Sequence, residues 1–216
     1  MIKANQYIKT KTKQDIFSKI DTEEKAYWLG FLYADGCVRS REQDNQIELS
    51  LQERDYKHLV KFRKFIGNEN AIAYREKQKA YRYCFRSKQI KMDLIKLGCT
   101  PKKSLTLTFP TKEQVPDSLL RHFMRGYTDG DGCLCVSKGK MSYELLGTEE
   151  FFIGLQKRCS LFEKKMYYAK KNTSVKRLYF GGKQDVKNIC NWLYQDANIY
   201  LDRKYEKYYN YYHLPC

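Results

Sequence analysis

Two aspartates, Asp35 and Asp131, each precede a glycine at the end of a stretch of apolar and small residues. The two stretches run from Ala26 to Gly36 and from His122 to Gly132. Asp-Gly is a turn signal, and here it would lead from a helix into a strand. If the two stretches pack side by side, their carboxylates meet. Paired carboxylates can hold divalent cations, which assist the hydrolysis of phosphodiester bonds.

The spacing within each stretch predicts a helix with one apolar face. Apolar or small residues recur at positions i, i+3, i+4 and i+7, namely Tyr27, Gly30, Phe31 and Ala34, then Phe123, Gly126, Tyr127 and Gly130. In each set, two small residues stand four apart on the same face. Small residues let two helix backbones approach closely, so we expect these two helices, called the motif helices below, to pack against each other.

The elements after each motif helix are predicted to repeat. After the first we expect strands over 36–42 and 45–51, a helix over 54–66, strands over 71–77 and 80–87, and a helix over 90–97. After the second we expect strands over 132–138 and 141–146, a helix over 148–161, strands over 163–170 and 175–180, and a helix over 183–196. Gly36 and Gly132 are 96 residues apart, while Phe85 and Phe180 are 95 apart. This near-constant offset indicates two similar half-domains.

The same pattern divides the chain into four parts. Residues 1–20 form a basic N-terminal arm, either solvated or lying along phosphate. Residues 21–98 form the first half-domain, beginning at a capping pattern of Asp21 and Glu24. Residues 99–115, punctuated by prolines, form a linker. Residues 116–216 form the second half-domain, in which Pro116 could start the second motif helix and a charged, tyrosine-rich helix closes the chain.

The segments Trp28–Gly36 and Met124–Gly132 resemble the two motif copies of a monomeric LAGLIDADG homing endonuclease. The second copy is the closer match, because Tyr33 of the first stands where an acidic residue is common in that family. The resemblance implies an α+β fold of two pseudo-symmetric αββαββα half-domains packed through the motif helices. It also implies that two antiparallel sheets form a DNA-binding saddle.

A metal site follows from this resemblance. Asp35 and Asp131 would be direct ligands, and the residues before them, Ala34 and Gly130, would each lend a backbone carbonyl. Hard oxygen ligands with open positions for water and phosphate indicate Mg²⁺. Asp129 should point elsewhere on the helix, and we interpret it as a capping or surface acid.

Three further residues are candidates for the chemistry. Lys88 and Lys183 occur in matching Lys-Gln pairs at the end of a predicted strand, where a lysine could orient water or stabilise the charge that develops on the phosphate. An alternative for each is an ordinary phosphate contact. Gln52 ends a strand where the family often has a polar, water-orienting residue, although its repeat partner is Thr148.

The polar faces of the predicted strands are the expected recognition surface. A twisted antiparallel sheet from each half can lie in the major groove of duplex DNA. The side chains that we place there are Arg39, Arg41, Gln46, Glu48, Arg82, Arg86, Arg177 and Tyr179. Each alone could be an ordinary solvated strand residue, so only the collective pattern argues for DNA.

Composition narrows the class of protein. The 216 residues carry a net charge of +16, which favours a polyanionic partner, nucleic acid before membrane. There is no run of 18 apolar residues and no apolar signal core, so we expect an intracellular protein without a membrane span, its compartment and host left open. The eight cysteines form no Cys-x-x-Cys pair and are interpreted as reduced thiols. Three histidines give little support to a His-based metal nuclease, and no Gly-rich phosphate loop is found.

The predicted function is a monomeric, site-specific double-strand DNA endonuclease that uses divalent metal at a long pseudo-palindromic target. Two alternatives stay open, an RNA maturase that binds intron RNA and a DNA-binding protein that does not cleave. The presence of both Asp35 and Asp131 favours the nuclease.

Overall fold

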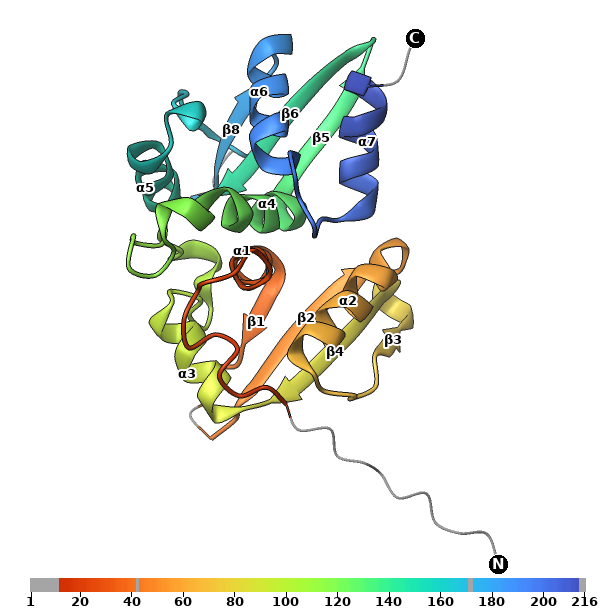
Figure 1. Ribbon diagram of the computed structural model, residues 1–216, viewed down its shortest axis with the longest axis vertical. Helices are drawn as coiled ribbons and strands as arrows, with labels where there is room; N and C mark the ends of the chain where they lie inside the picture. The colour runs from red at the N-terminus through yellow and green to blue at the C-terminus, as the bar shows by residue number, and fades with distance from the viewer. Residues whose placement is uncertain (1–11, 42, 171–172, 214–216) are drawn as a thin grey trace, which may run out of the picture.

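The computed structural model describes residues 12–41, 43–170 and 173–213, and it consists of two similar halves (Figure 1). The first half contains α1 (Glu23–Asp35), β1 (Gly36–Val38), β2 (Gln46–Gln52), α2 (Tyr56–Ile66), β3 (Ala73–Arg75), β4 (Ala80–Arg86) and α3 (Lys88–Lys96). The second contains α4 (Leu120–Asp131), β5 (Gly132–Ser137), β6 (Lys140–Gly147), α5 (Glu149–Arg158), β7 (Tyr167–Tyr168), β8 (Lys176–Phe180) and α6 (Lys183–Tyr194), followed by α7 (Asp202–His213). The predicted αββαββα order is confirmed in both halves.

Each half has one four-stranded antiparallel sheet, ordered β1-β2-β4-β3 in the first and β5-β6-β8-β7 in the second. The registers match, because Gly36 pairs with Leu49 and Gly132 pairs with Leu145, again 96 residues apart. Helix α2 covers one face of the first sheet, and α6 lies over the second sheet on the same side of the molecule (Figure 1). The opposite face of each sheet is therefore left for other contacts.

Alternation along β2 shows how the sequence builds these two-faced sheets. Ile47, Leu49 and Leu51 are buried against the helices, whereas Glu48 and Ser50 point to the other face and are partly or fully exposed. Successive side chains of a strand point to opposite faces. The period of two therefore separates an apolar face for the core from a polar face.

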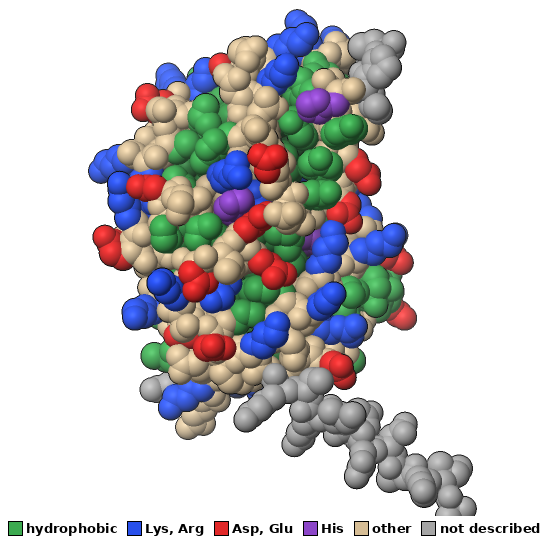
Figure 2. Space-filling model, in the orientation of Figure 1, with side chains coloured by type: hydrophobic (Ala, Val, Ile, Leu, Met, Phe, Trp, Pro, Cys, Tyr) green, Lys and Arg blue, Asp and Glu red, His purple; other side chains and the backbone are tan. Residues whose placement is uncertain are grey.

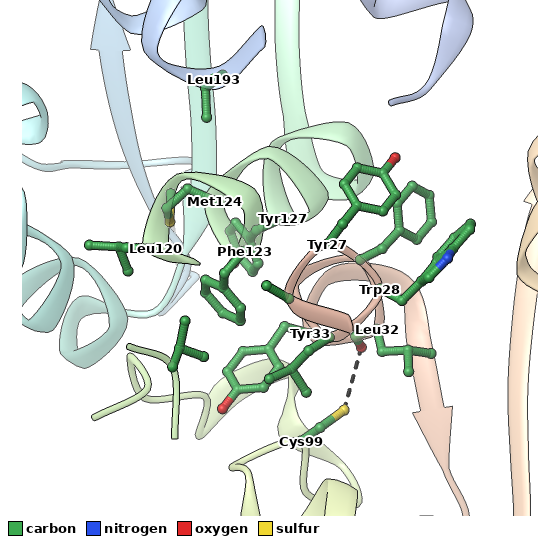
Figure 3. Packing of buried hydrophobic residues seen from close by; sticks show 14 of the residues in the cluster. Tyr27, Trp28, Leu32, Tyr33, Cys99, Leu120, Phe123, Met124, Tyr127 and Leu193 are labelled. Carbon is green, nitrogen blue, oxygen red and sulfur yellow. Dashed lines mark hydrogen bonds between the residues drawn. The ribbon is translucent and has the colours of Figure 1, made fainter. Parts of the chain in front are cut away.

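The two halves meet where the motif helices α1 and α4 cross at the centre of the molecule (Figure 1). A Cβ placed on Gly30 would lie 1.9 Å from the carbonyl oxygen of Phe123, and one placed on Gly126 would lie 1.9 Å from that of Tyr27. Glycine is thus required at both positions. Aromatic rings fill the space beside them, with the Tyr33 and Phe123 ring centroids 5.0 Å apart (Figure 3).

The N-terminal arm ends earlier than predicted. Ile16, Phe17 and Ile20 are buried in the core, and the Phe17 ring packs edge-on against Phe65 at 5.7 Å. The apolar residues within this basic segment therefore hold it to the first half, and residues 1–11 lie outside the described part. Thr22, rather than the predicted Asp21 pattern, caps α1 by accepting a hydrogen bond from the Lys25 N–H at 3.3 Å.

The predicted linker is packed rather than loose. Leu107, Phe109 and Val115 are buried, and the Phe109 ring lies 5.1 Å from that of Phe151 in the second half. Pro116 precedes a short 3-10 turn, so the second motif helix begins at Leu120 instead of at the proline. Among the described residues, no helix combines the length and apolar character needed to cross a membrane.

Candidate active site

Asp35 and Asp131 are the last residues of the two motif helices, just over one turn beyond the close approach at Gly30 and Gly126. A Cβ placed on Gly130 of α4 would lie 2.3 Å from the Cβ of Ala34 and 3.2 Å from Oδ2 of Asp35. The carboxylate of Asp35 therefore reaches across to the last turn of α4, beside Asp131. The pairing of the two acids predicted from the sequence is what the structure shows.

The surroundings raise the pKa of both acids above the ordinary value for aspartate. Burial, and next the charge of Asp131, raise the pKa of Asp35 to about 6, while Lys204 and Lys103 act to lower it. Burial also raises the pKa of Asp131, against the same two lysines. Asp35 is nevertheless exposed and Asp131 is half-buried, so solvent and ions can reach the pair. A cation bound here would relieve the mutual repulsion of the two carboxylates.

Hydrogen bonding distinguishes this pair from Asp129. Within the described part of the chain, neither Asp35 nor Asp131 accepts a side-chain hydrogen bond, so their oxygens can coordinate a cation. Asp129 has its oxygens occupied by the hydroxyls of Tyr27 and Tyr194, each at 2.8 Å, and by the Leu201 N–H at 2.7 Å. Asp129 points away from the pair, as predicted. It is 1% exposed, however, so its interpretation as a capping or surface acid was wrong.

Two lysines that no sequence pattern predicted lie beside the aspartates. Lys103 donates from Nζ to the carbonyls of Gly36 at 2.5 Å and Ala34 at 3.4 Å. Lys204 donates to the carbonyls of Thr128 at 2.7 Å and Gly132 at 2.5 Å. Both are buried, 7% and 5% exposed. Each ammonium therefore holds the backbone on either side of one Asp-Gly turn, where a cation also suits the C-terminus of a helix.

The sequence offset that relates the two halves does not relate these two lysines. Lys103 and Lys204 are 101 residues apart, outside the offset of 95 or 96 that relates the sheets. One belongs to a short 3-10 turn in the predicted linker, and the other to the closing helix α7. The one usable signal is that Lys103 comes seven residues after the end of α3 and Lys204 ten residues after the end of α6, its counterpart.

The structure does not bring the predicted lysines to the aspartates. Lys88 is the first residue of α3. The N–H of Ser87, just before it, donates to the Asn45 carbonyl. Asn45 is four residues along the chain from Leu49, which pairs with Gly36, the residue after Asp35. Four residues of strand span roughly 13 Å. The Lys88 side chain is exposed at this outer end of the sheet.

Lys183 lies at the corresponding outer end of the second sheet. Its carbonyl accepts a hydrogen bond from Tyr212, eight residues beyond Lys204 on α7. Eight helical residues span about 12 Å. Lys183 therefore lies beside the C-terminal end of α7, whereas Lys204 is near the N-terminal end of that helix. The shared Lys-Gln dipeptide marks the start of a helix in each half, not the centre of the site.

Gln52 is exposed at the last position of β2, where it pairs with Ala80. Its repeat partner Thr148 is instead buried and donates a hydrogen bond to the Leu107 carbonyl. Thr148 also lines a cavity of about 250 Å³ together with Lys103 and Asp131. The polar position at the strand end therefore differs between the halves, and a role for Gln52 stays a prediction.

The polar face of the first sheet gathers most of the predicted recognition residues. Glu48 accepts from Arg39 and Arg82, both at 3.3 Å, and from the Gln46 amide at 3.2 Å. Arg86 in turn donates to Gln46 at 3.4 Å. This network presents arginine side chains at fixed positions on the open face. Arg41 lies exposed in the turn between β1 and β2, and its carbonyl accepts from Lys91.

The second sheet carries a smaller version of the same network. Arg177 lies 3.6 Å from Glu144, and Glu144 pairs across the strands with the exposed Tyr179. Glu48 and Glu144 are 96 residues apart, which places the two acids at matching positions of the two sheets. The described cysteines are all free thiols, so no disulfide joins them.

Solved structures with the same architecture are LAGLIDADG homing endonucleases. The I-LtrWI enzyme bound to target DNA is 13% identical, with a TM-score of 0.58 over 87% of this chain and 89% of that one. I-SmaMI bound to an uncleaved DNA target in the presence of calcium ions is 13% identical, with a TM-score of 0.59 over 89% and 90% of the two chains. I-GzeII in complex with its DNA target is 12% identical, with a TM-score of 0.57 over 86% and 88%. No protein-family model matches the sequence, and no curated protein matches it.

Proposed function

We propose that this chain, which has the two-domain fold of the single-chain LAGLIDADG homing endonucleases, is a site-specific DNA endonuclease. The observation that carries the proposal is the pair Asp35 and Asp131, adjacent at the ends of the two motif helices, whose oxygens accept no hydrogen bond from the residues that the structure describes. A scaffold that only bound DNA would have no need of two such acids facing each other.

The donor set fits a hard divalent cation, and we propose Mg²⁺. Asp35 and Asp131 would hold it, with help from the carbonyls of Ala34 and Gly130, while water and phosphate oxygens would complete the coordination. When bound, such a cation supplies charge stabilisation for the scissile phosphate and lowers the pKa of a bound water. The Ala34 carbonyl already accepts a long hydrogen bond from Lys103, so lysine and cation would share that oxygen.

Lys103 and Lys204 are proposed to keep the turns that carry the aspartates in place and to add positive potential where the phosphate must sit. Burial lowers the pKa of Lys204 to about 8, with Asp129 acting in the opposite direction, so the ammonium remains largely protonated at pH 7. Each lysine serves the Asp-Gly turn of its own half. Each is therefore expected to support the cut of one DNA strand.

Duplex DNA is proposed to lie across the open faces of the two sheets. Those faces carry the Glu48 and Glu144 networks, whose arginines can donate to base edges in the major groove. Lys and Arg side chains are spread over both halves, also on the side that carries α2 and α6 (Figure 2). A net charge of +16 favours a long polyanion. Because one chain supplies both halves, a monomer would suffice for a target with two unlike half-sites.

The proposal is tested by incubating the purified protein with a randomised duplex DNA library and Mg²⁺, then sequencing the cut ends. The expected result is a single long preferred site, cut on both strands. Binding of a specific duplex without any cut would favour the non-cleaving alternative. Preference for structured RNA over every duplex would favour the maturase alternative.

A further inference from the structure

The carboxylate of Asp129 joins three elements of the second half to α1 of the first. It accepts hydrogen bonds from Tyr27 of α1, from Tyr194 at the end of α6 and from the N–H of Leu201 just before α7. Tyr27 donates its one hydroxyl proton to Asp129. In the 2.9 Å hydrogen bond between Tyr27 and His58, Nε2–H of the histidine must therefore donate to the tyrosine oxygen. A hydrogen-bonded chain thus runs from α2 to the buried acid.

Leu201 connects this acid to the active-site lysine. Its carbonyl accepts the N–H groups of Lys204 and Tyr205, which form the first turn of α7. Asp129 therefore fixes the residue from which α7 starts. From this first turn, Nζ of Lys204 reaches the C-terminus of α4, where it also donates to the Asp129 carbonyl at 2.7 Å. Asp129 therefore binds Leu201 through its side chain and the Lys204 ammonium through its backbone carbonyl.

The segment between α6 and α7 is fixed on its other side by Arg125, which is fully buried. Its guanidinium donates to the carbonyls of Leu193 and Ile199 at 2.9 and 2.8 Å, and to Glu23 of α1 at 2.6 Å. Because Arg125 is one turn before Asp129 on α4, both residues tie the approach to α7 to the same helix.

The first half does not use this device. Tyr33 occupies the position that matches Asp129, and its hydroxyl donates to the Leu97 carbonyl at the end of α3. Lys103 reaches its Asp-Gly turn from a 3-10 turn of three residues, Lys103–Leu105, rather than from a long helix. The two lysines occupy similar places but depend on different supports.

We propose that Asp129 is a positioning residue for Lys204, and that it supports the cut of one DNA strand only. This inference rests on the proposed function. The pseudo-two-fold relation of the halves also relates the two strands of a bound duplex, so loss of the support for Lys204 should affect the strand that Lys204 serves. The other strand, served through Lys103, should be cut as before.

The test uses Asp129→Asn in the full chain with the target found in the library. Asparagine keeps the shape but offers the two lone pairs of one oxygen to three donors, so at least one of these donors loses its acceptor. Supercoiled plasmid and duplexes labelled on either strand report each cut separately. The strand slowed by Lys204→Met should be slowed about 10-fold or more by Asp129→Asn, the scale of lost outer contacts in metal sites. The variant should leave the other strand, and DNA affinity in Ca²⁺, unchanged.

Equal slowing of both strands, or slowing of the strand that Lys103→Met affects, would overturn the inference while leaving the endonuclease proposal intact. A wild-type chain that cuts no duplex would instead refute the proposed function. Asp129→Glu, which keeps the charge, should restore part of the rate on the same strand. Tyr33→Phe is the matched control, because it removes the hydroxyl at the equivalent position of the other half. It should not slow the strand that depends on Lys204.

Should Asp129→Asn fail to fold, Tyr194→Phe replaces it, since that change removes only one donor to Asp129. A folded Tyr194→Phe protein that shows no slowing, or equal slowing of both strands, would refute the positioning role. Slower cutting of the Lys204 strand alone would support it.

Discussion

Replacing Gly126 by alanine is the most direct perturbation of the helix crossing. The added Cβ would lie 1.9 Å from the Tyr27 carbonyl oxygen, whereas real Cβ atoms essentially never come within 3.0 Å of such an atom. The obstacle is backbone, which cannot rotate away as a side chain can. Helices α1 and α4 must therefore separate by more than about 1 Å, or the crossing must tilt.

The Gly126→Ala change should lower both the melting temperature and the rate of cleavage. Overpacking of this kind destabilises by about 1–3 kcal/mol, and about 2–4 °C of melting temperature accompanies each kcal/mol in a chain of this size. We expect a decrease of about 2–12 °C in a calorimetric scan. Gly130 is one turn along α4, so the separation also moves Asp131 from Asp35. A misplacement of about 1 Å can cost about 100-fold in rate.

Gly182→Ala is the matched control, because a Cβ there meets its nearest atom, Oδ2 of Asp185, at an ordinary 3.4 Å. It should melt close to the wild-type protein. A Gly126→Ala protein that melts with this control and cuts DNA at the wild-type rate would refute the close packing of the two motif helices.

Three further predictions concern the partner, the lysines and the buried histidine. The logarithm of the DNA binding constant should fall against log salt with a slope of about −0.9 per neutralised phosphate, and a flat dependence in a filter-binding titration would contradict the sheet-face model. Lys103→Met and Lys204→Met should each convert the enzyme into one that mostly nicks, on opposite strands, whereas Lys88→Met and Lys183→Met should linearise plasmid at the normal rate; the reverse pattern would restore the prediction made from the sequence. Burial lowers the pKa of His58 to about 3, so its neutral form contributes stability that is complete above pH 6.5 and is lost as pH falls toward 3. The free energy of unfolding in urea should drop by about 2 kcal/mol more between pH 7 and pH 4.5 in the wild-type protein than in His58→Gln, and parallel curves would show that His58 is not the titrating group.

The sequence was sufficient for the architecture because its signals are local. Spacing of three and four around Gly30 and Gly126 predicted both motif helices, and alternation along Ile47 to Leu51 predicted a two-faced strand. Edge strands were less well predicted, since β7 covers only Tyr167–Tyr168 within the expected 163–170. An edge strand has one partner instead of two, so its length depends on the surrounding loops more than on its own pattern.

Sequence patterns predicted the aspartates of the candidate site but not its lysines. Asp35 and Asp131 are marked by their turns, but Lys103 and Lys204 become part of the site only through tertiary contacts made about 70 residues further along the chain. The burial of Asp129 depends on Tyr194 and Leu201, which are similarly distant. Helical periodicity could show that Asp129 points away from Asp131, but not what fills that space.

The most direct test of the account compares cleavage with binding in Asp35→Asn and Asp131→Asn. Asparagine keeps the shape of each side chain and removes the charge that would hold the cation. Single-turnover cleavage of the selected site in Mg²⁺ should fall about 100-fold or more in each variant, because a metal ligand is lost. Affinity for the same duplex in Ca²⁺ should persist. Normal cleavage by both variants would show that the paired aspartates do not hold the metal, and the central claim would fail.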